Sequence, residues 1–265
     1  MACFRDRMKP GHRGARALTS AALAGSGVLA YLAAWQRWSG VCPRGGFDEP
    51  ACLKRQDHLY DYQLPASPWH PIGDAAELYG LSVLLLAVAA FALPFLLMPA
   101  FRRLILWPLA VIPAAMLAGI GVLVLASGIA GRPVTVPDFY LTALIVVNVL
   151  WPTALIIAAA IAAGGYILTE WPEASEDRPA TARSVSTVVT ALLIAATTVL
   201  PTYFLVGPIA AGYVSHDTAP WSEAPAGALL VLAAMVMWPA TTRVTSRKST
   251  KGVSRLSAES LNVSD

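Results

Sequence analysis

The stretch that decides the fold is residues 75–100, AAELYGLSVLLLAVAAFALPFLLMPA, whose only charged side chain, Glu77, lies near its start. An α-helix of about 20 apolar residues is long enough to cross a lipid bilayer. Further apolar runs of this kind recur along the chain. The sequence therefore predicts an all-α fold, a polytopic transmembrane helical bundle of six spans. The expected spans are residues 17–35, 75–100, 104–130, 139–168, 185–206 and 226–240.

The composition favours a membrane protein over a large soluble domain. Of the 265 residues, 56% are apolar and only 13% are charged, and the mean hydropathy is +0.59. An ordinary soluble domain is about 25% charged, and its surface helices carry charged and apolar residues within every turn. Here the charges gather between the apolar runs, so we expect the runs to face lipid.

The segments around the spans define the domain organisation. The expected parts are a basic arm at residues 1–16, a membrane domain at residues 17–240, and a disordered cytoplasmic tail at residues 241–265. An outer loop, residues 38–74, connects the first two spans. The first apolar run has the basic flank of a secretory signal. Its length and its aromatic pair, Trp35 and Trp38, favour an uncleaved first span instead.

Positive charge orients the predicted bundle. Six spans place both termini on one side, and 14 of the 19 Lys and Arg residues lie on that side. Because cytoplasmic loops are rich in Lys and Arg, both termini are expected to be cytoplasmic. The basic face then meets anionic lipid, so the net charge of +3 does not indicate nucleic-acid binding. The composition, rich in alanine and in arginine over lysine, favours a bacterial inner membrane.

Two of the three cysteines lie in the outer loop. Cys42 and Cys52 close a ring of 11 residues with two prolines and two glycines, a composition that allows the chain to turn back on itself. We expect a structural disulfide worth about 3 kcal/mol on the chain-entropy model. A redox-active pair is the alternative, but the spacing differs from the C-x-x-C motif. Cys3 is expected to be a free thiol on the cytoplasmic arm.

The outer loop also gathers imidazole and carboxylate groups. The candidate polar cluster of the outer face comprises His58, Asp61, His70, Asp74 and Glu77, with His216 and Asp217 as further members from a later loop. Such ligands suit a divalent metal such as zinc, but their spacing matches no metal motif. The alternative interpretation is a solvated loop in which the D-x-x-E pattern at residues 74–77 starts a helix. We therefore assign no catalytic, cofactor-binding or metal-binding residue from the sequence.

Three prolines exclude helix from residues 64–71 of the loop. We expect this segment to be extended. It then either covers the outer ends of the helices or forms part of a partner-binding surface.

Inside the membrane, the predicted spans contain no Asp, Glu, Lys, Arg or His, which argues against an ion-coupled pump. Asn148, in the fourth span, is the most polar intramembrane side chain. The fifth span adds a row of threonines, Thr190, Thr197, Thr198 and Thr202. We interpret these groups as hydrogen-bonding between helices, at around 1 kcal/mol each. A polar substrate path through Asn148 and the threonines is the alternative.

The functional expectation follows from these observations. We expect a non-enzymatic accessory or scaffold subunit of an inner membrane, without cofactors, that presents the disulfide-closed loop to other membrane-protein subunits. One alternative is a small permease for an uncharged solute, with Asn148 on its path. The other is a membrane enzyme with a His and carboxylate site at the outer face.

Overall fold

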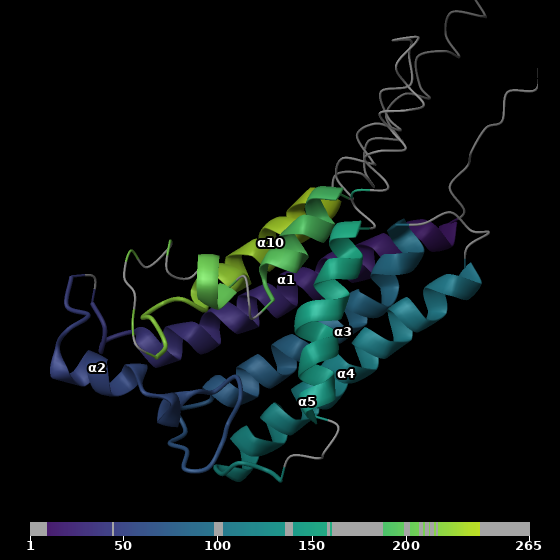
Figure 1. Cartoon of the computed structure of the whole chain (residues 1–265). Coiled ribbons are helices and arrows are strands. Elements are labelled where there is room, and N and C mark those ends of the chain that lie inside the picture. Colours follow the sequence, from purple (N-terminus) through teal and green to yellow (C-terminus); the bar gives the residue numbers. More distant parts are fainter. Residues whose placement is uncertain are drawn as a thin grey trace, which may run out of the picture.

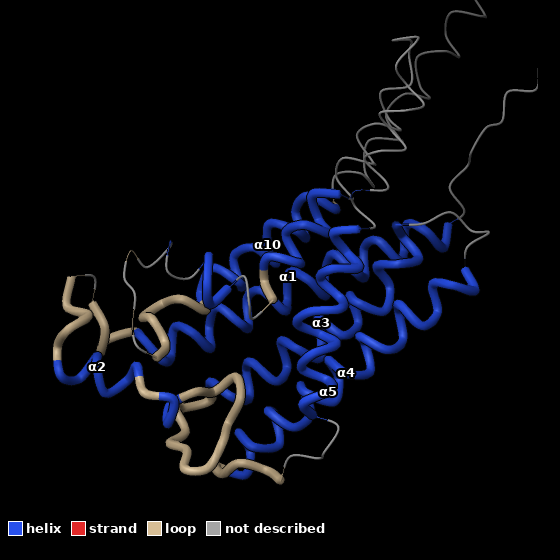
Figure 2. The backbone as a smooth tube through the Cα atoms, viewed as in Figure 1, coloured by secondary structure: helices blue, strands red, loops and turns tan. Residues whose placement is uncertain are grey.

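A computed structural model describes most of the chain between residues 10 and 238 (Figure 1). The described residues are 10–43, 45–97, 103–135, 140–157, 160, 188–198, 202–206, 209, 212, 215 and 217–238. Within these ranges every regular element is helical and no strand occurs (Figure 2). The predicted all-α class is confirmed. The first nine residues of the predicted arm, and the tail at residues 241–265, lie outside the described residues.

The long helices match three of the expected spans. They are α1 (Pro10–Trp38), α3 (Ala75–Leu97) and α4 (Arg103–Ala130). The shorter elements are α2 (Pro50–Gln56), the 3₁₀ turn η1 (His58–Tyr60), α5 (Tyr140–Ile145), the π-helical turns η3 (Val146–Leu150) and η4 (Thr202–Val206), and α10 (Ala224–Met237). Among the described helices, the three long ones contain segments long and apolar enough to cross a membrane: Gly14–Trp38, Ala75–Leu96 and Ala110–Ala130. These segments indicate a membrane protein.

Two expected spans differ from the structure in ways that matter for the site. The first was expected at residues 17–35, but α1 begins at Pro10, within the predicted arm, and continues to Trp38, where contacts bury Arg37 and Trp38. The fifth was expected as one helix at residues 185–206. Its described helical residues end at 196, followed by a turn at Thr197 and a bend at Thr198, before η4 begins at residue 202. Hydropathy alone does not detect such interruptions.

Small residues allow the helices to approach closely. α1 and α10 run antiparallel, with Ser20 Oγ donating to the carbonyl of Ala234 at 2.7 Å. Further along the same interface, a Cβ added at Gly27 would lie 2.5 Å from the carbonyl oxygen of Gly227. α3 packs antiparallel to α1, where the hydroxyls of Ser26 and Ser82 lie 3.0 Å apart. Membrane helices use small residues and interhelical hydrogen bonds in this way, because lipid provides no hydrophobic drive between them.

α4 packs antiparallel to α3 through glycine in the same manner. A Cβ at Gly80 would lie 2.6 Å from the amide nitrogen of Leu125, and one at Gly128 would lie 2.7 Å from Cγ of Glu77. These directions bring the end of α1, the start of α3, the end of α4 and the start of α10 to one end of the bundle (Figure 1).

Exposed aromatic side chains mark both ends of the bundle. Trp35 and Tyr31 are exposed near the end of α1, and Trp238 is exposed at the far end of α10. Because Ser20 contacts Ala234, Trp238 lies roughly level with residue 16 of α1. The 19 residues from there to Trp35 correspond to about 28 Å of helix. This separation matches the hydrocarbon thickness of about 30 Å, at whose boundaries Trp and Tyr are enriched.

Candidate functional site

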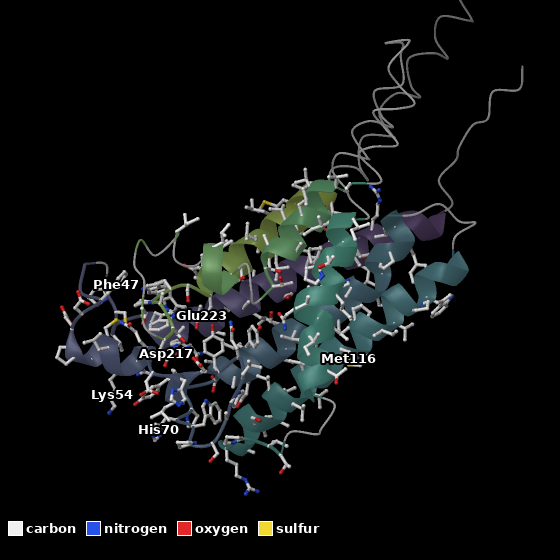
Figure 3. The ribbon with its side chains drawn as sticks, viewed as in Figure 1. Phe47, Lys54, His70, Met116, Asp217 and Glu223 are labelled. Atoms are coloured by element: carbon white, nitrogen blue, oxygen red, sulfur yellow. A yellow bond between two sulfur atoms is a disulfide. The ribbon has the colours of Figure 1, made fainter. Side chains whose placement is uncertain are left out.

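Residues 39–74, which we call the cap, lie at the end of the bundle where α1 ends and α3 begins (Figure 1). Phe47, Lys54 and His70 of the cap lie at this same end (Figure 3). The predicted disulfide is present, with the Cα atoms of Cys42 and Cys52 4.9 Å apart. Both cysteines are buried in a small hydrophobic core that is separate from the core of the helical bundle. The other buried residues of this core are Ala34, Trp38 and Ala224.

The chain between η1 and α3 is without helix, as its prolines predict. This part of the expected outer loop is therefore irregular, but the loop also contains α2 and η1, which the sequence interpretation missed. α2 is only seven residues long and begins with Pro50, so no hydrophobic period was long enough to indicate it.

Arg37, in the last turn of α1, lies at the centre of the contact between cap and bundle. Its side chain is fully buried, and its Nη1 lies 2.6 Å from Oδ1 of Asp61 and 3.0 Å from Oε1 of Glu223. Nε and Nη2 donate to the carbonyl oxygen of Arg55 at 3.3 and 3.2 Å. One guanidinium thus joins α1, the cap and the residue that precedes α10.

Further hydrogen bonds complete this group, which we call the Arg37 cluster (Arg37, Trp38, Asp61, Thr218 and Glu223). The indole N–H of Trp38 donates to Oε2 of Glu223 at 2.6 Å. The hydroxyl of Thr218 donates to Oδ1 of Asp61 at 3.2 Å. Both carboxylates therefore accept from at least two donors, as buried charges require.

The cluster contains two carboxylates and one guanidinium. Burial raises the pKa of Glu223 above its ordinary value of 4.5, and Arg37 and the Trp38 hydrogen bond oppose this rise. Burial likewise raises the pKa of Asp61 above 3.8, opposed by Arg37 and reinforced by the negative charge of Asp217. With both acids ionised the three groups carry a net charge of −1. The negative charge of Asp61 adds to the rise in the pKa of Glu223.

Contacts from the segment before α10 fix the rest of the cap. The amide of Gln56 donates to the carbonyl of Phe47 at 2.9 Å and accepts from the hydroxyl of Ser215 at 2.6 Å. The indole of Trp221 donates to the carbonyl of Cys42 at 3.0 Å. The cap is therefore attached to this segment by side-chain hydrogen bonds as well as by the Arg37 cluster.

The five residues of the predicted polar cluster lie in different surroundings. Asp61 belongs to the Arg37 cluster, and the ring of His70 packs on Tyr60 with centroids 5.5 Å apart. Asp74 directly precedes α3, and its backbone N–H donates to Oε1 of Gln36 at 2.8 Å. Glu77 lies in the first turn of α3, against α4.

His58 is the member of that cluster placed near other metal-ligating groups. Asp57, His58 and Asp217 are the set among the described residues whose ligand atoms all lie within 4.8 Å of one another. Both carboxylates already accept backbone N–H groups, Asp57 from Leu59 at 2.9 Å and Asp217 from His58 at 2.7 Å. These hydrogen bonds explain why the three side chains lie together without a metal ion, as a contact within the cap and between the cap and Asp217. His216 lies outside the described residues.

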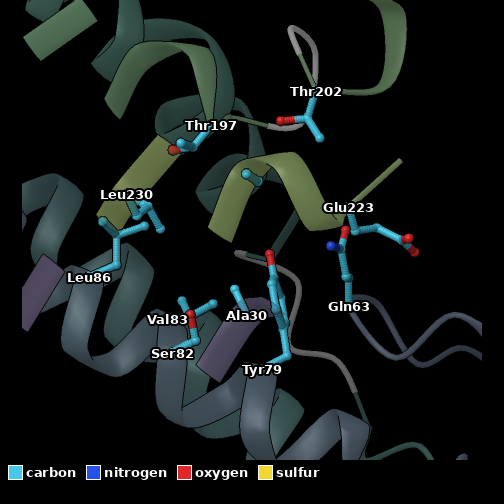
Figure 4. A pocket seen from close by; sticks show the side chains of 11 residues that line it. Ala30, Gln63, Tyr79, Ser82, Val83, Leu86, Thr197, Thr202, Glu223 and Leu230 are labelled. Carbon is cyan, nitrogen blue, oxygen red and sulfur yellow. The ribbon is translucent and has the colours of Figure 1, made fainter. Parts of the chain in front are cut away.

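Asn148 lines a mainly apolar space beneath the cap that also contains several polar side chains. Two cavities of about 50 and 70 Å³ have five lining residues in common, and together we call them the chamber. The shared residues are Gln63, Tyr79, Val83, Leu86 and Thr197. Tyr79, Thr197 and Thr202 surround the smaller cavity, and the carboxylate of Glu223 at its edge points away from them (Figure 4). Asn148 and Thr198 line the larger cavity.

Three of the four threonines in the fifth predicted span make hydrogen bonds that differ from the expectation. The hydroxyls of Thr197, Thr198 and Thr202 donate to backbone carbonyls in their own segment, at 2.7, 2.8 and 3.3 Å. Among the described residues, Ser20 of α1 and the pair Ser26 and Ser82 make hydrogen bonds between helices. Thr and Ser side chains compete with the backbone in this way where a helix is interrupted.

Sequence reasoning missed the two charged residues that matter most here. Arg37 and Glu223 lie just outside the apolar runs expected at residues 17–35 and 226–240, so hydropathy does not single them out. The sequence indicates the importance of these two residues only through their neighbours. Arg37 lies between Trp35 and Trp38, and Glu223 directly precedes an apolar run. Comparisons of the chain with protein-family models, with curated proteins and with solved structures found no match.

Proposed function

We propose that the protein is a non-enzymatic accessory subunit of a bacterial cytoplasmic membrane, with six spans, that displays the cap to another membrane protein. The observation that carries this proposal is the Arg37 cluster, which fixes the cap to α1 and to the start of α10. A loop that only links two helices needs no buried ion cluster. Burying each charge costs several kcal/mol, and pairing with an opposite charge is needed to offset this cost. A partner-binding surface benefits from being fixed, since less entropy is lost on binding.

The free face of the cap has groups suited to a partner. α2 buries Cys52 and Gln56 on one face and exposes Leu53, whose exposed fraction is 48%. Lys54 and Glu49 are exposed beside it, so an apolar contact has charges of both signs at its rim. Interfaces commonly combine an apolar centre with a polar rim. The expected partner is an extracytoplasmic segment of another subunit.

Site-specific photo-crosslinking in intact cells tests the proposal. A photoreactive residue at Leu53 should give one adduct of discrete mass, and the adducted protein should co-purify in stoichiometric amount in mild detergent. The same residue at Val122, an exposed position on α4, is the control and should give lipid adducts only. Absence of a discrete adduct at Leu53, with the protein purifying alone, would contradict the scaffold function.

Reporter fusions test the topology separately. Fusions at Gly46 and Lys251 should report opposite compartments, with Lys251 in the cytoplasm. Reports from the same compartment would contradict the six-span arrangement, whatever the crosslinking shows.

The second candidate function is a permease for a small uncharged solute. The chamber favours it, because Asn148 and the interrupted segment at Thr197 and Thr198 line one space. Solute uptake into proteoliposomes should then fall in Asn148→Leu and remain in wild type. Equal uptake by wild-type and protein-free liposomes would exclude transport.

A further inference from the structure

We propose that the chamber is a binding site for a small uncharged molecule that both donates and accepts hydrogen bonds, such as a primary amide. This goes beyond display of the cap and requires neither a partner protein nor transport.

The first argument is the backbone around the chamber. Asn148 lies within η3 and Thr202 begins η4, and both are π-helical turns. Such turns make up well under 1% of residues in proteins and occur frequently at functional sites. Thr197 and Thr198 lie where a helix has just ended. Irregular backbone at membrane depth is tolerated where it is buried in protein or lines a cavity. Here η3 and the turn at Thr197 and Thr198 line the larger cavity, and Thr202 of η4 lines the smaller one.

The second argument is the set of hydrogen-bonding groups. Thr197, Thr198 and Thr202 use their O–H groups on backbone carbonyls, so their oxygens retain acceptor capacity. The indole N–H of Trp151, which lines the larger cavity, is buried without an acceptor among the described residues. A buried donor without an acceptor is uncommon in native proteins. A ligand with one donor and one acceptor would complement this lining.

The third argument is charge and size. The one carboxylate at the edge, that of Glu223, points away and is held by Arg37 and Trp38. The described lining is otherwise uncharged, and its apolar side chains come from several elements, among them Val83 of α3, Leu117 of α4 and Leu230 of α10. An ion would therefore be left unpaired there, at high cost. Volumes of about 50 and 70 Å³ suit a molecule of a few heavy atoms, or a small group of waters.

The position of the chamber explains how a ligand would be retained. Tyr79 is one turn into α3, so the chamber begins roughly 6 Å below the start of that helix. Gln63 and Leu64 of the cap lie over it. The cap therefore covers the chamber, which lies in the half of the bundle nearest Tyr31 and Trp35 of α1.

The test uses the purified full chain in lipid nanodiscs with acetamide as the probe. Ligand-observed NMR should show saturation transfer from the protein to acetamide at millimolar concentration. Asn148→Leu and Thr197→Val, in different segments, should each reduce the transfer at least fivefold. Acetate, which has the same shape but carries a charge, should show none.

Thr19→Val is the matched control. Thr19 is a buried threonine of α1 whose hydroxyl donates to the carbonyl of Ala15 at 2.8 Å, as Thr197 donates to Ile194, but it does not line the chamber. Its transfer should equal that of wild type. Acetamide transfer no greater than in empty nanodiscs would overturn the proposal and leave the chamber to water. Unchanged transfer in both chamber variants would also overturn it, whereas the crosslinking at Leu53 is unaffected by either result.

Discussion

Replacing Arg37 by methionine tests the contact between cap and bundle most directly. The substitution keeps an unbranched side chain of similar length but removes the cation that lies 2.6 Å from Asp61 and 3.0 Å from Glu223. Removing one partner of a buried ion pair typically costs about 3–5 kcal/mol, because the remaining charge stays desolvated without its partner. We expect a loss of about 3–5 kcal/mol in the free energy of unfolding at neutral pH.

The measurement is denaturant unfolding of the purified protein in detergent, followed by tryptophan fluorescence. Arg55→Met is the matched control, since it removes the same charge from the cap. The guanidinium of Arg55 lies 5.0 Å over the ring of Tyr60, so its loss should cost about 1 kcal/mol or less. The difference between the two variants isolates the buried position from the change in net charge.

Acidification should partly rescue Arg37→Met. Without the cation, Asp61 and Glu223 lose the interaction with Arg37 that lowers their pKa values, so these pKa values rise further. Protonation at low pH then removes part of the free-energy cost of burying the two negative charges. The destabilisation should therefore be smaller at about pH 5 than at about pH 8. Two results would refute this reasoning. One is a cost no larger than that of Arg55→Met, and the other is a cost that does not change with pH.

Three further predictions follow from particular contacts. Because the pKa values of both cluster carboxyls are raised on folding, their stabilising contribution is full below the ordinary values of 3.8 and 4.5 and is lost as pH rises through the folded values. Asp61→Asn should flatten this dependence in unfolding measured between about pH 4 and pH 8, and a slope equal to that of wild type would contradict it. Gly27→Leu should cost about 2–3 kcal/mol through its clash with α10, whereas Gly14→Leu, with no atom within 4 Å of an added Cβ, should not lower stability measurably. Replacing Cys42 and Cys52 together by serine should cost about 3 kcal/mol in the same assay, and an unchanged midpoint would show that the cap is held without the disulfide.

Much of the fold was predictable because it depends on local composition. The run at residues 75–100 became α3 at Ala75–Leu97, and the run at residues 104–130 became α4 at Arg103–Ala130. The disulfide was predictable because only a short, turn-rich ring separates its cysteines. The interruption near Thr197 was not, because threonine is compatible with an apolar run and hydropathy averages over the residues that break the helix.

The sequence by itself determined that this chain forms apolar helices, where α3 and α4 begin, and that a disulfide closes the short ring between Cys42 and Cys52. Each of these depends on neighbouring residues along the chain. Only the tertiary structure decided that Arg37 and Glu223, 186 positions apart, are buried against each other, and that Asn148 faces the chamber. Burial of a charge depends on which groups surround it in space, and the antiparallel packing of α1 and α10 through glycine brings those groups together.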